Sequence, residues 1–168
     1  MMRYKMIVCK SVHHGNTRAV AERLAAILET SVSDPDDTDL PNMDDTWMIG
    51  IGSGIYYARF HKSIRDWVKR LPADTGLGRQ VFLFSTSGLP FLSALYHYPL
   101  RRSLRRKGIE VVAEFSCRGH DTFDPLWLFG GLNRQHPNLR DLERAEVFTK
   151  ELMSEQLAQQ EYVRSPAP

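Results

Sequence analysis

The chain has 168 residues, of which 42% are hydrophobic and 25% are charged, and its formal net charge is +2. These values are typical of one soluble globular domain, and the charge is too small to indicate a nucleic-acid-binding protein. The two cysteines lie far apart, so we expect neither a disulfide framework nor a zinc site. We expect a reducing, cytoplasmic setting and no integral membrane segment.

Strand-like and helix-like segments alternate along the chain. Short apolar runs predict strands, and apolar residues at helical spacing predict helices. The predicted strands are Tyr4–Cys9, Ser31–Ser33, Trp47–Gly52, Val81–Ser85 and Ile109–Phe115. The predicted helices are Arg18–Thr30, His61–Leu71, Tyr98–Lys107 and Asn138–Gln160. The alternation predicts an α/β fold in which helices cover both faces of a five-stranded parallel sheet.

Ligands of such a sheet bind at the carboxyl ends of its strands, so the loops that follow the strands are expected to carry the chemistry. These loops are residues 11–17, 53–60, 85–97 and 117–137. Two charged stretches, an acidic one within 34–45 and a basic one within 101–107, are expected to be solvated surface. Residues 1–162 are expected to form the domain, and residues 163–168 a flexible tail.

The first loop has the composition of a phosphate-binding turn. Its candidate ligands are Ser11, His13, His14, Gly15, Asn16 and Thr17. A glycine permits a tight turn, free N–H groups at a helix start bind anions, and hydroxyl and amide side chains add donors. The loop lacks the lysine of a Walker A motif and the three glycines of a dinucleotide fingerprint, which favours a phosphate monoester. The alternative is an ordinary strand-to-helix turn with Asn16 as the N-cap.

The other three loops offer a seat for a flat ring. The candidate contacts are Ser53, Gly54, Ile55, Tyr56 and Tyr57 in the second loop, Ser85, Thr86, Ser87 and Gly88 in the third, and Cys117, Arg118 and Gly119 in the fourth. Aromatic side chains can stack on the ring, small residues let backbone donors face its edge, and a cation stabilises an anionic reduced ring. Each loop also has a plain structural interpretation. The aromatics of the second loop would pack it against a helix, the third loop has ordinary turn residues, and the cysteine of the fourth loop would be a buried apolar residue. No spacing of histidines and acids matches a metal site.

The run Gly50-Ile51-Gly52-Ser53-Gly54 also contains closely spaced glycines. It fails as a dinucleotide fingerprint, because Ile55 stands where the third glycine of that motif is required and because it follows the wrong strand.

The loop Ser11-Val12-His13-His14-Gly15-Asn16-Thr17 resembles the phosphate loop of the flavodoxin family. The resemblance extends over nearly the whole chain and implies a flavodoxin-like three-layer sandwich with strand order 2-1-3-4-5 that binds FMN. It implies that the first loop holds the FMN phosphate and that the later loops contact the flavin ring. Residues 115–119 and 136–148 also resemble uncharacterised bacterial members of this family.

The resemblance implies a redox role, either electron transfer or a small flavin-dependent reductase, with a redox partner protein or a small acceptor such as a quinone. Residues 52–61 resemble a loop of menaquinone-dependent protoporphyrinogen oxidases, so a quinone-coupled dehydrogenase is one alternative. A flavodoxin-fold binding module without FMN is another. Two departures matter: the chain is slightly basic, whereas carrier flavodoxins are acidic, and residues 85–97 form a shorter connection than in those oxidases.

Overall fold

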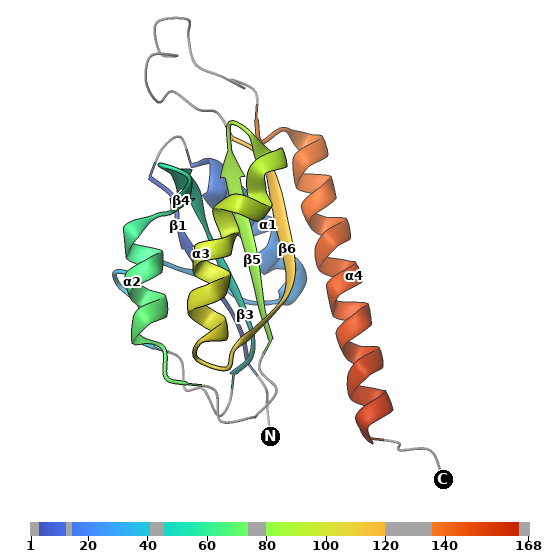
Figure 1. The fold of residues 1–168 in the computed structure, drawn as a ribbon. Coiled ribbons are helices and arrows are strands. Elements are labelled where there is room, and N and C mark those ends of the chain that lie inside the picture. The colour runs from blue at the N-terminus through green and yellow to red at the C-terminus, as the bar shows by residue number, and fades with distance from the viewer. Residues whose placement is uncertain (1–3, 13–14, 41–45, 74–79, 120–135, 165–168) are drawn as a thin grey trace, which may run out of the picture.

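A parallel sheet with helices on both faces forms the molecule (Figure 1). The structure is a computed structural model that describes residues 4–12, 15–40, 46–73, 80–119 and 136–164. Its strands are β1 (Tyr4–Lys10), β2 (Val32–Ser33), β3 (Thr46–Tyr56), β4 (Arg59–Phe60), β5 (Gln80–Ser87) and β6 (Glu110–Arg118). Its helices are α1 (Asn16–Leu28), α2 (Lys62–Arg70), α3 (Ser93–Arg105) and α4 (Leu139–Arg164), with a 3-10 turn η1 (Pro90–Leu92) before α3.

The strand order β2-β1-β3-β5-β6 confirms the predicted order, because β4 lies off this path. The unpredicted β4 pairs antiparallel with the end of β3, where Ile55 faces Phe60 and Tyr56 faces Arg59. The second loop is therefore mostly a short hairpin, and β3 continues four residues beyond the predicted end at Gly52.

The predicted helix Tyr98–Lys107 actually begins at Ser93. The sequence suggested the later start because proline is favoured in the first turn of a helix and disfavoured in its interior. Pro99 lies in the interior of α3 nevertheless, and the side chain of Tyr96 before it is buried against the domain. At the other end of the chain, the helical backbone of α4 runs to Arg164, which includes the first two residues of the expected tail.

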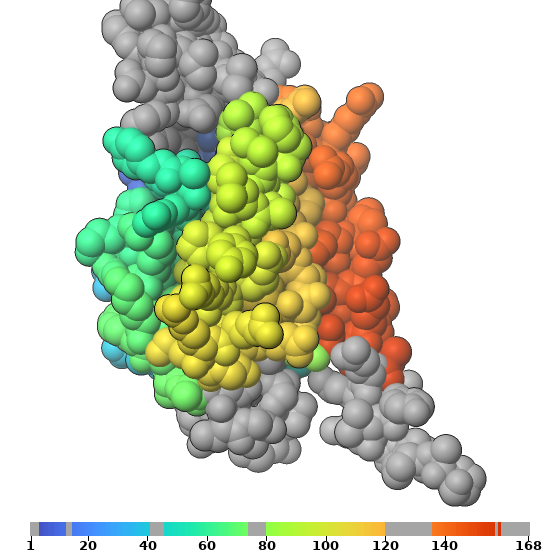
Figure 2. All heavy atoms as spheres, in the orientation of Figure 1, coloured from blue at the N-terminus to red at the C-terminus, as the bar shows by residue number. Residues whose placement is uncertain are grey.

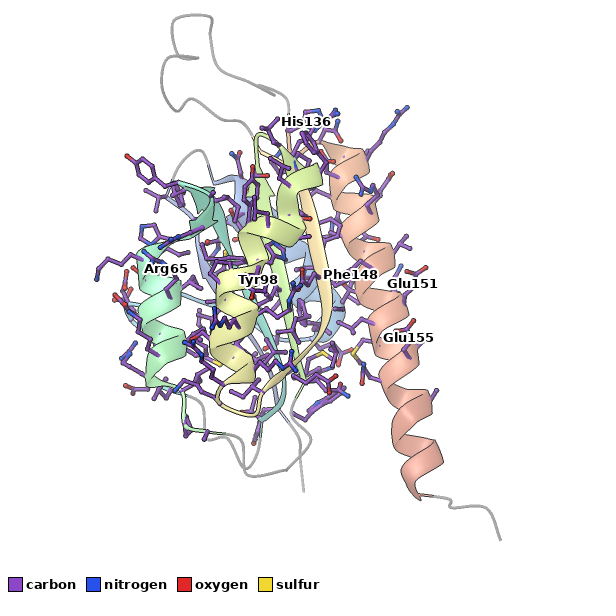
Figure 3. All side chains as sticks on the ribbon, viewed as in Figure 1. Arg65, Tyr98, His136, Phe148, Glu151 and Glu155 are labelled. Atoms are coloured by element: carbon purple, nitrogen blue, oxygen red, sulfur yellow. The ribbon has the colours of Figure 1, made fainter. Side chains whose placement is uncertain are left out.

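Side chains alternate between the two faces of the sheet, as the period of a strand requires. One face packs against α1 and α4 and includes Phe82 and Phe84 of β5. The other face packs against α2 and α3 and includes Val81 and Leu83 of the same strand. Phe148 of α4 extends the aromatic cluster on the first face, with its ring 6.0 Å from that of Phe82 (Figure 3).

The start of α4 is stabilised by a reciprocal pair of capping hydrogen bonds. The backbone N–H of Asp141 donates to Oδ1 of Asn138 (3.1 Å), and the N–H of Asn138 donates to Oδ2 of Asp141 (3.0 Å). In the described part of the chain, no helix is both long enough and apolar enough to cross a bilayer.

The glycines of β3 accommodate the aromatic rings of β5. Gly50 is paired with Phe82 and Gly52 with Phe84 across the two strands. A Cβ atom on Gly52 would lie 2.1 Å from Cε2 of Phe84, which is far inside van der Waals contact. The glycine run that resembled a nucleotide-binding motif therefore provides space for two core rings.

We predict that Gly52→Ala lowers the free energy of unfolding by about 1–3 kcal/mol, the usual cost of overpacking a filled core. Adding Phe84→Leu should recover part of the loss, so the two changes should be non-additive in urea denaturation. Gly54→Ala is the matched control, because its Cβ would meet only the far end of the Tyr56 side chain. Equal losses in Gly52→Ala and Gly54→Ala would contradict the interpretation.

Candidate functional site

The four predicted loops meet at one edge of the sheet. The strand register pairs Lys10 of β1 with Ser53 of β3, and Gly54 of β3 with Thr86 of β5. It also pairs Ser87 of β5 with Arg118 at the end of β6. The carboxyl ends of all four long strands therefore reach the same level, which brings the predicted contacts into one region.

Helix α1 begins after a glycine. Its N-cap is Gly15, in the left-handed region at φ 67°, so the capping position itself has no side chain that could bind the first-turn N–H groups. Asn16 is the first helical residue and not the N-cap, so the alternative interpretation of this loop is wrong on that point. No described heavy atom lies within 4 Å of the position a Cβ on Gly15 would take. The N–H groups of a first turn and the helix dipole are suited to binding an anion. His13 and His14 lie outside the described residues.

Direct contacts join the first, third and fourth loops. Oγ1 of Thr17 and Oγ1 of Thr86 share a buried hydrogen bond of 2.7 Å. The N–H of Gly119 donates to the carbonyl of Ser87 at 3.0 Å. A Cβ on Gly119 would lie 3.0 Å from Cβ of Thr86 and 3.2 Å from Nδ2 of Asn16. The backbone at Gly119 thus approaches both neighbouring loops closely, and a side chain there would require its neighbours to shift slightly.

The serine hydroxyls at this edge divide into two groups: those in the first group have hydrogen-bond partners inside the protein, and those in the second have none among the described residues. Oγ of Ser53 accepts from the N–H of His61 (2.9 Å) and donates to the carbonyl of Gly54 (2.6 Å), so it stabilises the hairpin. Oγ of Ser11 and Oγ of Ser87 are buried and have no hydrogen-bond partner among the described residues. A buried hydroxyl without a partner costs about 1–3 kcal/mol, so these two atoms are candidates to hydrogen-bond a ligand.

Ser85 belongs to the first group, because it is part of a buried hydrogen-bond chain. Its Oγ contacts Nε2 of His97 at 2.8 Å, and Nδ1 of His97 contacts Glu114 at 3.0 Å. Arg101 donates to the other oxygen of Glu114 at 2.6 Å. Burial alone would raise the pKa of Glu114, but the hydrogen bonds from His97 and Arg101 outweigh it and hold this pKa below its usual value. The sequence did not reveal this chain, because the predicted helix began one residue after His97.

The tip of the β3–β4 hairpin is strained and exposed. Its two turn residues, Tyr57 and Ala58, have φ of 50° and 58°. Asparagine and glycine usually occupy such turns, since other residues rarely adopt positive φ. The side chain of Tyr57 is 83% exposed beside the sheet edge. Ile55 and Tyr56 precede it and are partly buried, which leaves Tyr57 as the most accessible aromatic of the second loop.

Cys117 does not present its thiol to this edge. Its side chain is 1% exposed and lies in the core on the α1 and α4 side of the sheet. Burial raises its pKa to about 12, so the thiol stays protonated at neutral pH. Arg118, the last residue of β6, is exposed, and Gly88 directly follows β5.

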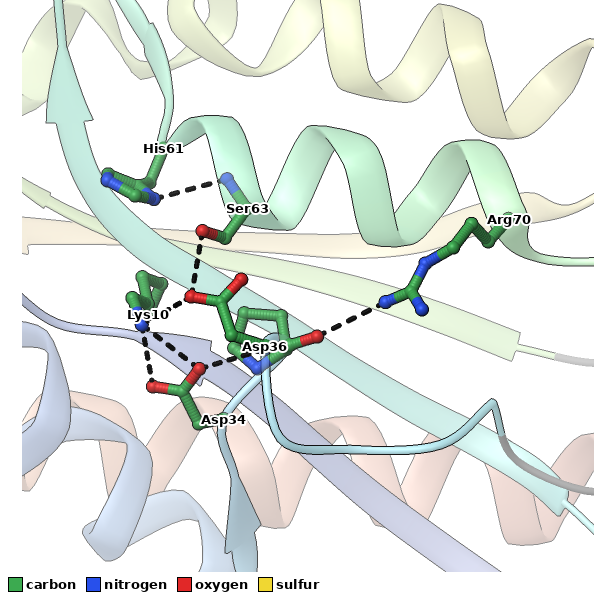
Figure 4. Close-up of polar contacts among 7 residues, drawn as sticks. Lys10, Asp34, Asp36, His61, Ser63 and Arg70 are labelled. Carbon is green, nitrogen blue, oxygen red and sulfur yellow. Dashed lines mark hydrogen bonds and ion pairs between the residues drawn. The ribbon is translucent and has the colours of Figure 1, made fainter.

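A polar cluster beside the first and second loops includes two of the acidic residues that were predicted to be plain surface (Figure 4). Nζ of Lys10 contacts Asp34 at 3.0 Å and Asp36 at 2.6 Å. Asp36 also accepts from Oγ of Ser63 at 3.0 Å. The cluster therefore links the end of β1 to the segment after β2 and to the start of α2. Asp34 and Asp36 flank a proline in an acid-rich run, which gave no sign of their common partner Lys10.

His61 caps α2 beside this cluster. Its Nδ1 accepts from the N–H of Ser63 at 3.2 Å, which requires that nitrogen to be unprotonated. The ring also makes an edge contact with Tyr56, at 5.4 Å between ring centroids. Burial lowers the pKa of His61, and the positive charge of Lys10 lowers it further. The neutral ring therefore holds the hairpin and the start of α2 together.

Comparison with known proteins gives one consistent result. Residues 6–90 match the family described as the flavodoxin domain. An uncharacterised protein of Methanocaldococcus jannaschii is 37% identical over 148 residues, covering 88% of this chain and 97% of that protein. The flavodoxin of Streptococcus pneumoniae TIGR4 has a TM-score of 0.64 at 16% identity, covering 90% of this chain and 99% of that one. The Fusobacterium nucleatum flavodoxin bound to flavin mononucleotide has a TM-score of 0.62 at 13% identity, covering 90% and 98%.

We predict that the protein loses stability as the pH falls below about 6.5, the ordinary histidine pKa. The pKa of His61 is lower in the folded state, so the unfolded state binds more protons in this range and is favoured. His61→Asn should keep a good N-cap and reduce this pH dependence. Urea denaturation of both proteins between about pH 8 and pH 5 measures it, and parallel profiles would contradict the assignment to His61.

Proposed function

This chain belongs to the flavodoxin domain family, and we propose that it binds one FMN and acts as a redox protein, as an electron carrier or a small flavin-dependent reductase. The Ser11 and Ser87 hydroxyls carry the proposal, because they are buried at the same sheet edge as the start of α1 and lack partners among the described residues. A ligand with both a phosphate and polar ring atoms would satisfy them. FMN has both features, and it is bound in the Fusobacterium nucleatum flavodoxin.

The first loop would hold the phosphate. Ser11 would donate its unpartnered hydroxyl, and the N–H groups at the start of α1 would bind the phosphate oxygens. Asn16 lies in the first turn, and Thr17 shares its hydroxyl with Thr86, so the two threonines would act as a unit. His13 and His14 remain proposed contacts from the sequence.

The ring would lie against the second, third and fourth loops. Tyr57 offers an exposed aromatic face, and Ser87 offers an unpartnered hydroxyl beside Gly88. Arg118 would supply a positive charge near the ring edge. Ser53, Ser85 and Thr86 would act mainly by holding the loops in place, because their hydroxyls already have internal partners. Any contact from Cys117 would come from its backbone.

When bound, FMN supplies electron transfer in steps of one or two electrons, and the protein supplies binding, orientation and electrostatics. No side chain is then required as a general acid or base. The electrons would pass to or from a redox partner protein or a small acceptor such as a quinone, and the cytoplasmic setting remains our expectation. The likeness of residues 52–61 to protoporphyrinogen oxidases also remains a prediction.

We predict that the purified protein is yellow, or becomes so on incubation with FMN. Absorbance spectroscopy and mass analysis of the released cofactor measure this directly. A protein that is colourless and fails to take up added FMN would contradict the proposal and favour a binding module without cofactor.

We predict that Ser11→Ala weakens FMN binding by roughly tenfold to a hundredfold, since a hydrogen bond to a charged group contributes about 1.5–3 kcal/mol. The same change should leave the stability of the FMN-free protein unchanged or slightly raised, because the deleted hydroxyl has no described partner there. Quenching of FMN fluorescence gives the affinity, and urea denaturation gives the stability.

Two serine variants control for general damage. Ser53→Ala removes two internal hydrogen bonds and should destabilise the FMN-free protein by about 1–2 kcal/mol. Ser154→Ala, on the exposed side of α4, should change neither quantity. A Ser11→Ala protein that loses stability but keeps its affinity would show that this hydroxyl is structural.

A further inference from the structure

The outer side of η1 and α3 combines exposed apolar side chains with arginines. Phe91 is 76% exposed, Leu95 63% and Tyr98 52%. Further along α3 the exposed residues include Arg102 and Arg105, and the exposed Arg106 follows directly. We call this region the α3 surface and define it as Leu89, Phe91, Leu95, Tyr98, Arg102, Arg105 and Arg106.

The α3 surface follows one stripe of the helix. Leu95, Tyr98, Arg102 and Arg105 are spaced by three or four residues, which places them along one side. The opposite side carries the buried residues Tyr96, His97, Leu100 and Leu104. Figure 2 shows α3 as a band across the front of the molecule, and Figure 3 places Tyr98 on it. The guanidinium of Arg101 lies 5.9 Å from the centre of the Tyr98 ring while binding Glu114, which helps to hold that ring.

The arginines of this surface have no acidic partner among the residues that the structure describes. None of Arg102, Arg105 and Arg106 forms an ion pair with another described residue. On the opposite side of the sheet, by contrast, Arg23 and Lys150 both contact Glu146. The two segments 62–70 and 93–107 on this side contain nine lysines and arginines and a single acid, Asp66. That acid is already bound by Lys62 and Lys69.

The apolar end of the α3 surface adjoins the proposed flavin seat. Leu89 and Phe91 follow Ser87 and Gly88 of the third loop directly in the chain. The arginine end lies further along α3, towards Gly108. A protein docked here would thus meet apolar contacts next to the cofactor and positive charge further away.

We propose that the α3 surface docks an acidic electron-transfer protein, a proposal that rests on the redox function above. Aromatic residues and arginine are enriched at the centres of protein interfaces, and exposed apolar patches mark such sites. Complementary charge selects the partner and speeds the encounter. The unpaired arginines of the α3 surface therefore favour a partner with an acidic surface.

A lipid surface fits the same residues less well. A helix that lies in a membrane interface turns its apolar side into the lipid and its basic side to water. The apolar side of α3 is already occupied by the protein core, through Tyr96, Leu100 and Leu104. The exposed apolar residues instead lie at one end of the helix and the basic residues at the other. A protein partner can contact both ends at once.

The test uses the FMN-loaded protein and an acidic [2Fe–2S] ferredoxin as the probe, with basic cytochrome c as the probe of opposite charge. Isothermal titration calorimetry measures the dissociation constant at low and at high salt. The wild type should bind the ferredoxin more tightly than cytochrome c, and salt should weaken this binding. Arg102→Glu with Arg105→Glu should weaken it at least tenfold at low salt. Tyr98→Ala should weaken it at both salt concentrations.

Arg144→Glu with Lys150→Glu on α4 is the control, because it changes the net charge equally on the other side of the sheet. Equal weakening by both double variants, or no ferredoxin binding by the wild type at low salt, would overturn the proposal. A third outcome would also overturn the proposal: the wild type binds vesicles of phosphatidylcholine and phosphatidylglycerol, or duplex DNA, and the α3 variants lose that binding but keep their affinity for the ferredoxin. FMN absorbance is recorded for each protein, so that failure to bind FMN, which refutes the redox function, is distinguished from failure to dock.

Discussion

The register between β3 and β5 is the constraint on which the candidate site depends. Gly50 and Gly52 accept the rings of Phe82 and Phe84, and a slip of one residue would place those rings against isoleucine and reverse the faces of the strand. Because that register is fixed, Gly54 and Thr86 end at the same level. Three features of the candidate site depend on this alignment of the strand ends. They are the hydrogen bond between Thr17 and Thr86, the close approach of Gly119 and the hairpin that carries Tyr57.

Much of this arrangement could be predicted from local patterns. Helix α1 and the central strands have clear periodicity, and the alternation of strands with helices predicts a parallel sheet, whereas the order of the strands was implied by the family resemblance. The β3–β4 hairpin could not be predicted, because its turn uses Tyr57 and Ala58 where the recognisable signal is asparagine and glycine. The roles of Ser53 and Ser85 were equally hidden, since their partners are a backbone N–H at His61 and the ring of His97. Sequence shows that a hydroxyl is present, whereas its free or bound state depends on tertiary contacts.

That distinction bears on how the edge of the sheet would bind a cofactor. Ser53, Ser85, Thr17 and Thr86 are already bound within the protein, so they hold the loops in position before any ligand arrives. Preorganisation of this kind reduces the entropy lost on binding. Ser11 and Ser87 have no hydrogen-bond partner among the described residues, and a ligand that satisfies them would remove the cost of about 1–3 kcal/mol that such a buried hydroxyl carries. Ligand binding would then also raise the stability of the fold.

The charge of the chain is informative only when it is placed on the structure. A net charge of +2 indicates little by itself, because it is the sum of two unlike sides. On the α4 side Arg23 and Lys150 both pair with Glu146, whereas Arg102, Arg105 and Arg106 of the α3 surface form no ion pair with the described residues. The unpaired arginines lie at the end of α3 away from the proposed cofactor edge, and the apolar residues of the α3 surface lie next to that edge. Positive charge placed there changes which partners can dock beside the edge, and it leaves the cofactor-binding loops as they are.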